Sequence, residues 1–252
     1  MKMSQDKYYN LQAIVLRNRL FKEHDKLVDL FSLERGRLTA VAKGASRPTG
    51  GLRGLTQPFT QVRLSMAKGR GSLDVITQGE VERAFISLRQ ELAKIAYASY
   101  MAELIILSMP EGKPGRSIFT LLLSAFSLLD MDVSPPLTSC FFELRLLRAL
   151  GLMPHLEDCM NCGRGIRGGS FLLSPAKGGL LCLSCATVSD GSVLNPGAIM
   201  TMRHILHEPI NRLPQLKVSQ QRLRELEQAI GTYMDYHLEY ALRARAMLKS
   251  LL

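Results

Sequence analysis

Four cysteines form the pattern with the most specific chemistry in this chain. Cys159 and Cys162 are separated by two residues, as are Cys182 and Cys185, and 182 − 162 − 1 = 19 residues lie between the pairs. This C-x2-C-x19-C-x2-C pattern falls within the spacing typical of four-thiolate zinc sites. Two cysteines on one tight turn can bind the same ion, and a second such turn completes a tetrahedron. Because four thiolates leave no open position for water, the pattern predicts one structural Zn2+ per chain.

Two disulfides or four free thiols are the alternatives for the same cysteines. Disulfides are typical of oxidising compartments, whereas residues 1–7 are polar and do not resemble a signal peptide. The spacing and the polar N-terminus therefore favour zinc. Cys140 stands apart at the start of an apolar helical pattern, where we expect a small buried hydrophobic side chain.

The charge of the chain favours polyanionic partners. Its 252 residues carry a formal net charge of +10, with an isoelectric point of about 9.6. Such an excess favours nucleic acid or an anionic membrane face. No run reaches the roughly 18 apolar residues of a membrane helix, so we expect a soluble, cytoplasmic protein.

The positive charge is concentrated between Arg35 and Leu73, a stretch without Asp or Glu. A face that is only solvated normally mixes both signs, because unmixed charge repels itself. Gly and Pro crowd the same stretch, and basic side chains on loops between strands suit a phosphate backbone. We expect residues 43–54 to form a mobile loop between the third and fourth strands. The candidate DNA-binding residues are Arg17, Arg37, Lys43, Arg47, Arg53, Arg63 and Arg70. The alternative is that these cations only keep the domain soluble.

The first part of the chain reads as a small β-domain. Five short runs alternate polar and apolar residues between Gly, Pro or charged turns; they are 11–16, 26–31, 37–42, 59–64 and 72–77. Five strands in about 80 residues, with a long basic loop, favour a five-stranded OB-type β-barrel, a fold that often binds oligonucleotides. We assign residues 1–80 to this domain, with Gly36 in the turn from the second strand to the third.

The rest of the chain reads as helices around the cysteine module, which makes an α+β multidomain protein. Helical spacings or apolar runs cover 91–109, 117–130 and a segment from Ser134 to Gly151. A helix over 197–207 and a last one from Ser219 follow the module. We assign 81–155 and 191–252 to the two parts of an α-helical bundle domain and 156–190 to an inserted zinc module.

Catalysis has little support in the sequence. The chain contains no G-x-x-x-x-G-K-[ST] loop, no G-x-S-x-G elbow and no H-E-x-x-H pair. The histidines are scattered, and an active site requires several groups in defined roles. We therefore expect a protein that is not an enzyme.

The order of barrel, helices, inserted four-cysteine module and helix resembles the RecO family of bacterial DNA repair proteins over nearly the whole chain. The resemblance rests on an ordered set of motifs: GRLTAVAKGASRP at 36–48, LTQPF at 55–59, ASYMAEL at 98–104, LRALGLMP at 147–154, and FLLSPAKGGLLCLSC at 171–185. No one of these motifs is diagnostic, but their combination is highly specific.

The resemblance implies a recombination mediator of the bacterial cytoplasm and nucleoid. Proteins of this family bind single- and double-stranded DNA, anneal complementary strands and, with RecR, help RecA load onto single strands coated by the single-stranded-DNA-binding protein. They bind the acidic C-terminal tail of that coating protein. We expect the helical bundle to receive the tail near its basic residues, which include Arg145, Arg148 and the C-terminal arginines.

Two other functions compete with this interpretation. A sequence-specific, zinc-containing DNA-binding regulator would require a recognition helix with exposed base-reading side chains, and none is evident. A nuclease would require clustered carboxylates for metal ions, and the basic stretch contains none.

Overall fold

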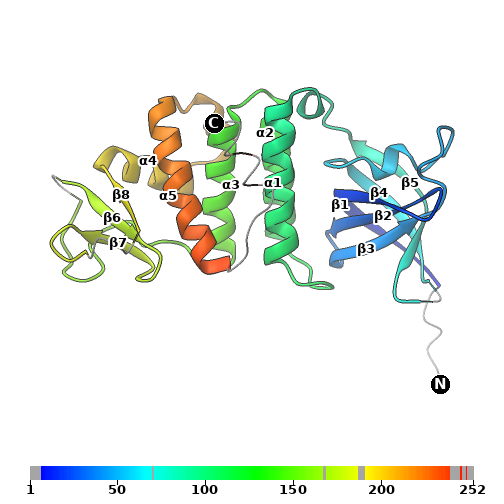
Figure 1. The fold of residues 1–252 in the computed structure, drawn as a ribbon, viewed down its shortest axis with the longest axis horizontal. Coiled ribbons are helices and arrows are strands. Elements are labelled where there is room, and N and C mark those ends of the chain that lie inside the picture. Colours follow the sequence, from blue (N-terminus) through cyan, green and yellow to red (C-terminus); the bar gives the residue numbers. More distant parts are fainter. Residues whose placement is uncertain are drawn as a thin grey trace, which may run out of the picture. The chain divides into compact units, whose positions relative to one another are not determined.

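The computed structural model describes residues 7–69, 71–166, 169–186 and 191–238, together with Arg245 and Leu248. Contacts within the chain divide it into two compact units, Met1–Phe126 and Ser127–Leu252. The division falls inside helix α2 (Arg116–Asp130). Figure 1 labels the elements of each unit. The domain boundaries at residues 80, 155 and 190 stay a prediction.

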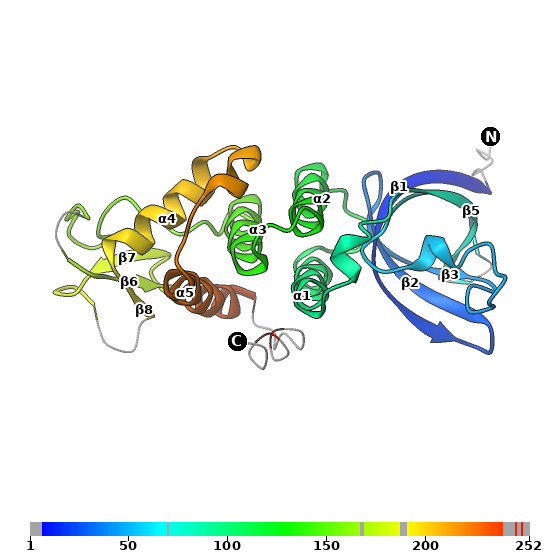
Figure 2. The ribbon, with the colours of Figure 1, turned by 90° about the horizontal axis from the view of Figure 1, so that it is seen from above.

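A closed five-stranded barrel forms the first part of the first unit. Its strands are β1 (Tyr8–Phe21), β2 (Asp25–Ser32), β3 (Gly36–Ala42), β4 (Gln61–Ala67) and β5 (Asp74–Arg83). The order around the ring is β1-β2-β3-β5-β4, and all neighbours are antiparallel except β3 and β5. Figure 2 shows the strands curving around a common interior. The predicted OB-type barrel is confirmed.

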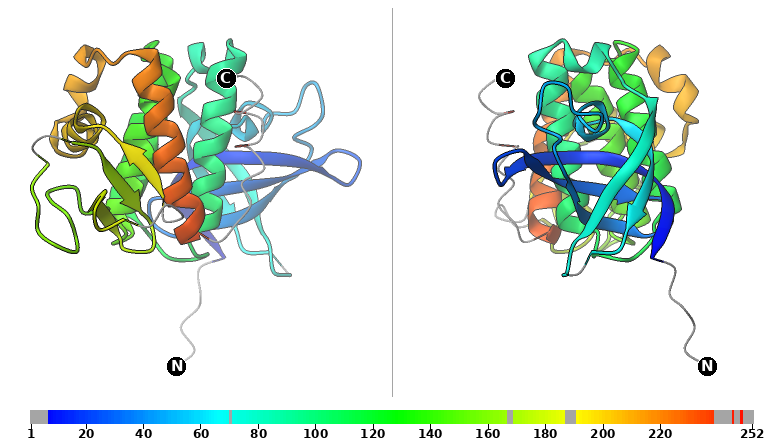
Figure 3. Two further views of the ribbon diagram at one scale, coloured as in Figure 1. Left: turned by 60° about the vertical axis from the view of Figure 1, so that its left-hand side comes forward. Right: turned by 90° about the vertical axis from the view of Figure 1, so that its right-hand side faces the viewer.

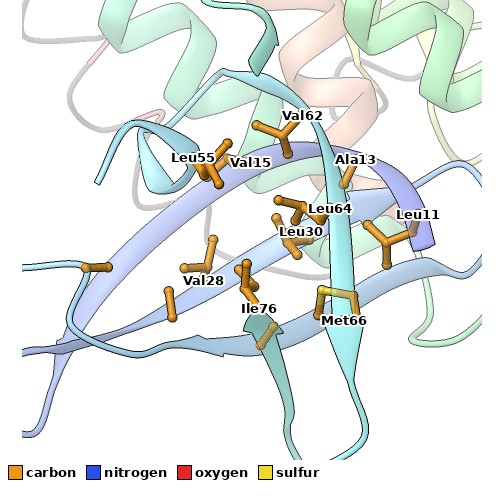
Figure 4. Packing of buried hydrophobic residues seen from close by; sticks show 13 residues of the cluster. Leu11, Ala13, Val15, Val28, Leu30, Leu55, Val62, Leu64, Met66 and Ile76 are labelled. Carbon is orange, nitrogen blue, oxygen red and sulfur yellow. The ribbon is translucent and has the colours of Figure 1, made fainter. Parts of the chain in front are cut away.

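The interior of the barrel is filled by apolar side chains from every strand. Alternation along the strands directs them inward, and Leu55 of a short 3-10 helix (Gly54–Thr56) joins them. Figure 4 shows this cluster, which includes Leu11, Ala13, Val15, Val28, Leu30, Val62, Leu64, Met66 and Ile76. The cluster holds the long β3–β4 connection against the barrel through Leu55.

One irregularity in β1 decides which side chains point outward. Val15 pairs with Leu30, yet Arg17 pairs with Asp29, so two residues of β1 oppose one residue of β2. Such a bulge inserts one residue, and a one-residue shift moves all later side chains to the opposite face. Val15 and Leu30 point into the core, whereas Arg17 and the odd-numbered residues that follow it lie on the outer face.

Helices α1 (Leu92–Ser108) and α2 pack against the barrel within the first unit. The Phe31 ring of β2 lies 6.1 Å from the Phe119 ring of α2, measured between centroids. Phe126 of α2 makes edge contacts with Phe59 at 5.5 Å and with Phe85 at 6.0 Å. The outer barrel face at Phe31 is therefore covered by protein.

The second unit combines helices with a small sheet. Helix α3 (Pro135–Ala149) is followed by β6 (Phe171–Ser174), β7 (Gly179–Cys182) and β8 (Ser192–Leu194), in the order β7-β6-β8. Helix α4 (Pro196–His207), a 3-10 segment (Ile210–Gln215) and α5 (Gln220–Leu238) complete it. The Asn195 side chain caps α4 by accepting a hydrogen bond from Ala198 N at 2.9 Å.

Most predicted elements agree with the structure, and the differences are local. The first strand extends to Phe21 rather than ending at Leu16, because the bulge interrupts the alternation of its residues. The three strands around the cysteines were not predicted. Cys140 is fully buried, as predicted, and burial raises the pKa of its thiol well above the usual value.

The turn between β2 and β3 requires glycine at position 36. Gly36 has a φ of +65°, and a Cβ there would lie 1.9 Å from the Lys113 carbonyl oxygen. Gly36→Ala should therefore lower the free energy of unfolding by about 3 kcal/mol, measured by urea denaturation. Gly51→Ala is the matched control, because a Cβ at Gly51 has no neighbour within 4 Å. Equal stability of the two variants would contradict this prediction.

Candidate metal centre and nucleic-acid interface

Two turns bring the four cysteines of the sequence pattern together. The first turn carries Cys159 and Cys162 and closes through Gly163, whose φ of +68° and hydrogen bond from N to Cys159 O (2.8 Å) reverse the chain. The second begins at Cys182, the last residue of β7, and Cys185 N donates to Cys182 O at 2.8 Å. Met160 N also donates to Leu180 O at 2.8 Å. The first turn is thereby attached to the strand that carries the second pair.

The sulfur atoms have the spacing of a tetrahedral site. All four Sγ atoms lie within 4.8 Å of one another, and those of Cys162 and Cys182 are 3.7 Å apart. A tetrahedron with metal–sulfur bonds of 2.3 Å has sulfur–sulfur edges of about 3.8 Å. Within the described part of the chain, no other group of three or more His, Cys, Asp or Glu side chains has an arrangement suited to an ion. The four cysteines fit a single tetrahedral ion.

The electrostatics of the cluster favour a cation among the sulfurs. Burial raises the pKa of Cys159, but hydrogen bonds from the backbone N–H groups of Cys182, Cys162 and Asn161 outweigh it and lower the pKa to about 6. A backbone hydrogen bond from Arg164 lowers the pKa of Cys162, whereas the thiols of Cys159 and Cys182 raise it, with a net value of about 11. The neighbouring sulfurs therefore do not all ionise together unless a cation compensates their charge.

Three of the candidate DNA-binding residues lie on the surface of the β3–β4 connection. Lys43, Arg47 and Arg53 are exposed, and the structure records no ion pair for any of them. Successive hydrogen bonds, such as those from Arg47 N to Gly44 O (3.1 Å) and from Arg53 N to Gly50 O (3.0 Å), build this segment from consecutive turns. Its three cations are available to an external anion.

Arg17 and Arg63 are candidates that already have acidic partners in the barrel. Arg17 Nε donates to Asp29 Oδ2 at 2.5 Å, although the side chain remains half-exposed. Arg63 pairs with Glu80 at 3.0 Å and with Glu82 at 2.7 Å, both in β5. Their charge is partly neutralised within the fold. Arg70 lies outside the described residues.

Arg37 connects the barrel to the α1–α2 segment. Its Nε donates to the Met109 carbonyl oxygen at 3.0 Å and its Nη1 lies 3.3 Å from Glu111. Gly112 N also donates to Arg37 O at 3.0 Å. The Arg37 side chain is only 22% exposed, so it contributes to the packing of the first unit.

The basic residues that the sequence assigned to tail binding also have internal partners. Arg145 donates to the carbonyl oxygens of Ile205 (3.2 Å) and Glu208, and Arg148 donates to Leu206 O at 2.8 Å. These contacts satisfy carbonyl groups at the end of α4. Among the C-terminal arginines, Arg245 pairs with Glu143 at 3.2 Å, whereas Arg243 lies outside the described residues.

Sequence reasoning missed the basic tip of the β1–β2 hairpin. Arg19 and Lys22 are exposed there, and Arg19 lies 3.7 Å from Asp29. Ser46 N donates to His24 O at 3.0 Å, and Gly44 N donates to the Asp25 carboxylate at 2.9 Å. The tip therefore adjoins the basic β3–β4 segment. The alternation Arg17, Arg19, Phe21 after the bulge was the signal that could have revealed this continuation of β1.

Comparison with known proteins identifies the class of this chain. A family model described as "Recombination protein O N terminal" matches residues 3–85, and one described as "Recombination protein O C terminal" matches residues 89–246. Together with the barrel and the cysteine cluster, these matches define a DNA repair and recombination protein.

Full-length relatives specify the family. The chain is 38% identical over 243 residues to the DNA repair protein RecO of Pelotomaculum thermopropionicum, covering 96% of this chain and 94% of that protein. It is 35% identical over 249 residues to RecO of Symbiobacterium thermophilum (96% and 97%) and 34% identical over 238 residues to RecO of Desulforamulus reducens (94% and 92%). The chain belongs to the RecO family. Its described helices include none that is long and apolar enough to span a membrane.

The contacts of Arg37 and Arg53 predict a large effect on stability for the first residue and almost none for the second. Arg37→Ala removes a hydrogen bond and an ion pair that attach the barrel to residues 109–111, and should lower the free energy of unfolding by about 2 kcal/mol. Arg53→Ala removes an exposed side chain and should change it by less than about 0.5 kcal/mol. Urea unfolding of both variants checks this, and an Arg37→Ala variant as stable as the parent would contradict it.

Proposed function

We propose that this chain is a recombination mediator that binds single- and double-stranded DNA without sequence preference and anneals complementary strands. The observation that carries the proposal is the β3–β4 segment of an OB-type barrel, which presents Lys43, Arg47 and Arg53 without recorded acidic partners. Cations of this kind neutralise phosphates and release counterions, which provides affinity without sequence information. Membership of the RecO family supports the same function.

Annealing by such a surface requires charge neutralisation rather than covalent chemistry. Two complementary strands repel each other as polyanions, and a basic protein surface reduces that repulsion. Under the proposed function, the protein is therefore not an enzyme. It uses binding energy alone to bring two strands together.

The proposal includes three protein partners taken from membership of the family. The chain acts with RecR to help RecA load onto single strands coated by the single-stranded-DNA-binding protein, whose acidic tail it binds. Because Arg145 and Arg148 already donate to carbonyl groups of α4, the residues that bind the tail should be sought among other cations of the helical region.

The decisive experiment is the annealing of complementary oligonucleotides coated with the cognate single-stranded-DNA-binding protein, with and without this chain. If the chain accelerates annealing equally for strands of unrelated sequence, the result supports the proposed mediator function. A protected footprint on one sequence would instead support a sequence-specific zinc-containing regulator, and metal-dependent cleavage of labelled DNA would support a nuclease.

The basic segment gives a quantitative prediction. In Lys43→Ala/Arg47→Ala, each lost phosphate contact should reduce the slope of log affinity against log salt by about 0.7 to 0.9 and weaken binding to all sequences alike. Annealing should slow while the unfolding midpoint stays unchanged. Fluorescence anisotropy across a salt series measures the slope.

Lys217→Ala/Arg224→Ala is the matched control for that variant. It removes the same net charge from exposed side chains in the second unit, for which the structure records no ion pair. A parental salt slope in the Lys43 and Arg47 variant would show that these two residues do not contact phosphates. An equal loss in the control would show that total charge rather than this segment determines DNA affinity.

We further propose that the four-cysteine cluster holds one structural Zn2+. Thiolates are the ligands that zinc prefers in closed tetrahedral sites, and the 3.7 Å separation of Cys162 and Cys182 matches the edge of such a site. The ion would connect the 159–162 turn to the end of β7 and so stabilise the folded module.

Removal of one ligand tests the metal proposal. Cys162→Ser should reduce bound zinc from one per chain to nearly none, because Ser does not replace a thiolate ligand. Cleavage by protease in residues 156–186 should then accelerate, while the barrel keeps its DNA affinity. Elemental analysis and limited proteolysis measure these effects. The control variant Cys140→Ala should retain the zinc. Absence of zinc from carefully purified parent protein would contradict the proposal.

A further inference from the structure

The outer face of the β1–β2 hairpin combines an aromatic ring with two arginines. Residues paired across antiparallel strands lie on the same face. The bulge places Arg17, Arg19 and Phe21 on the outer face of β1. Arg19 pairs with Leu27, and Leu27 pairs with Val41 of β3. Phe21, Leu27 and Val41 therefore occupy neighbouring rows of one outer sheet surface.

The surroundings of Phe21 match one nucleotide of a single strand. Its ring is partly exposed, and the Lys22 amine lies over it, 5.5 Å from the ring centroid, so a stacked base would take the place of this flexible, exposed side chain. Arg17 and Arg19 lie further along the same face, each with 54% of its side chain exposed. An aromatic ring with cations beside it complements a nucleobase and its phosphates.

Two of the three acidic groups near this surface accept hydrogen bonds within the fold. Asp29 is only 5% exposed and accepts hydrogen bonds from Arg17 at 2.5 Å and from Thr39 at 2.6 Å. Asp25 accepts a hydrogen bond from Gly44 N, whereas the Glu23 side chain is 88% exposed at the tip of the hairpin. With Lys43 and Arg47 of the adjoining β3–β4 segment, the exposed cations near the hairpin outnumber its one exposed acid, Glu23.

The hairpin also projects where a strand can reach it. Figure 3 (left) shows the dark-blue β1–β2 hairpin extending from the barrel beside the lighter-blue β3–β4 segment. The hydrogen bond from Ser46 N to His24 O joins the two segments. A strand whose phosphates lie along the β3–β4 cations can thus place an unpaired base on the hairpin.

We infer that Phe21 is a base-stacking residue that binds an unpaired nucleobase and so favours single-stranded over duplex DNA. This inference rests on the DNA binding proposed above and deepens it, because phosphate contacts alone do not distinguish unpaired from paired bases. Stacking uses the flat face of the base, which is common to all four bases, and therefore adds no sequence preference.

The first test removes the ring. Phe21→Ala should weaken binding to oligothymidylate about tenfold, measured by fluorescence anisotropy. Its salt slope should equal that of the parent, since no phosphate contact is lost. Affinity for a blunt duplex and for an abasic strand of the same length should not change, because neither offers an unpaired base. Phe21→Tyr should restore the parental affinity.

Leu20→Ala is the matched control for the ring removal. Leu20 is 73% exposed on the same hairpin but pairs with Lys26, on the opposite face from Phe21. Its truncation should leave affinity for oligothymidylate unchanged. A comparable loss of affinity in Leu20→Ala would show that the effect of Phe21→Ala comes from a disturbed hairpin rather than from loss of the ring.

The absence of Trp from the sequence allows a direct optical test. In Phe21→Trp, the new indole should be quenched when oligothymidylate binds and not when the abasic strand binds. Tyr8→Trp is the comparison, because Tyr8 is an exposed aromatic at the other end of β1 with the Lys7 amine 5.8 Å from its ring centroid. It should show no quenching.

The outcomes separate this inference from the function on which it rests. A parent that binds oligothymidylate while Phe21→Ala binds it equally well, or loses the same factor on the abasic strand, overturns the stacking role alone. A parent that binds neither single strands nor duplex overturns the DNA-binding function, and the stacking role with it.

Discussion

Closure of the barrel by β1 is the constraint on which the rest of the first unit depends. β1 pairs with β4 along its first half and with β2 along its second half, and one inserted residue near Arg17 allows it to serve both. Without that bulge, Asn18 and Leu20 would face outward and Arg17, Arg19 and Phe21 would face the interior side of the sheet. The same irregularity that lets the strand close the ring therefore determines which side chains meet solvent.

The cations of the barrel fall into two classes, those with an ion pair to a carboxylate and those without one. Arg37 and Arg63 neutralise carboxylates brought near them by the fold, and the hydrogen bond from Arg37 to Met109 O joins the barrel to the helices. Lys43 and Arg53 lie on a segment of turns, and the structure records no ion pair for either of them. A fold can keep a net excess of positive charge at low cost only where the charges are solvated and separated. The β3–β4 segment meets both conditions.

Features that depend on short-range spacing were predictable from the sequence. Features that depend on the register between strands were not. The cysteine cluster depends on two local turns, and its spacing alone indicated it. The barrel followed from alternation and turn residues, but the end of β1 did not, because the bulge changes the parity of the pattern after Leu16. The partners of Arg63 also escaped prediction: Glu80 lies outside the acid-free stretch of the sequence and reaches Arg63 through the pairing of β4 with β5. Counting charge along the chain therefore overestimates the charge that is free on the surface.

An annealing surface has to satisfy two opposing requirements. It must hold strands strongly enough to offset their mutual repulsion, yet leave the hydrogen-bonding edges of their bases free to pair. Phosphate contacts from exposed cations meet the first requirement without touching the bases. A ring such as Phe21 would engage only the π-face of a base, so it could hold a strand unpaired without blocking its Watson–Crick edge. Once the duplex forms, the base stacks on its neighbours and the ring loses its ligand. In the proposed function, a surface that combines both kinds of contact therefore binds the reactant strands more tightly than their product and favours release after annealing.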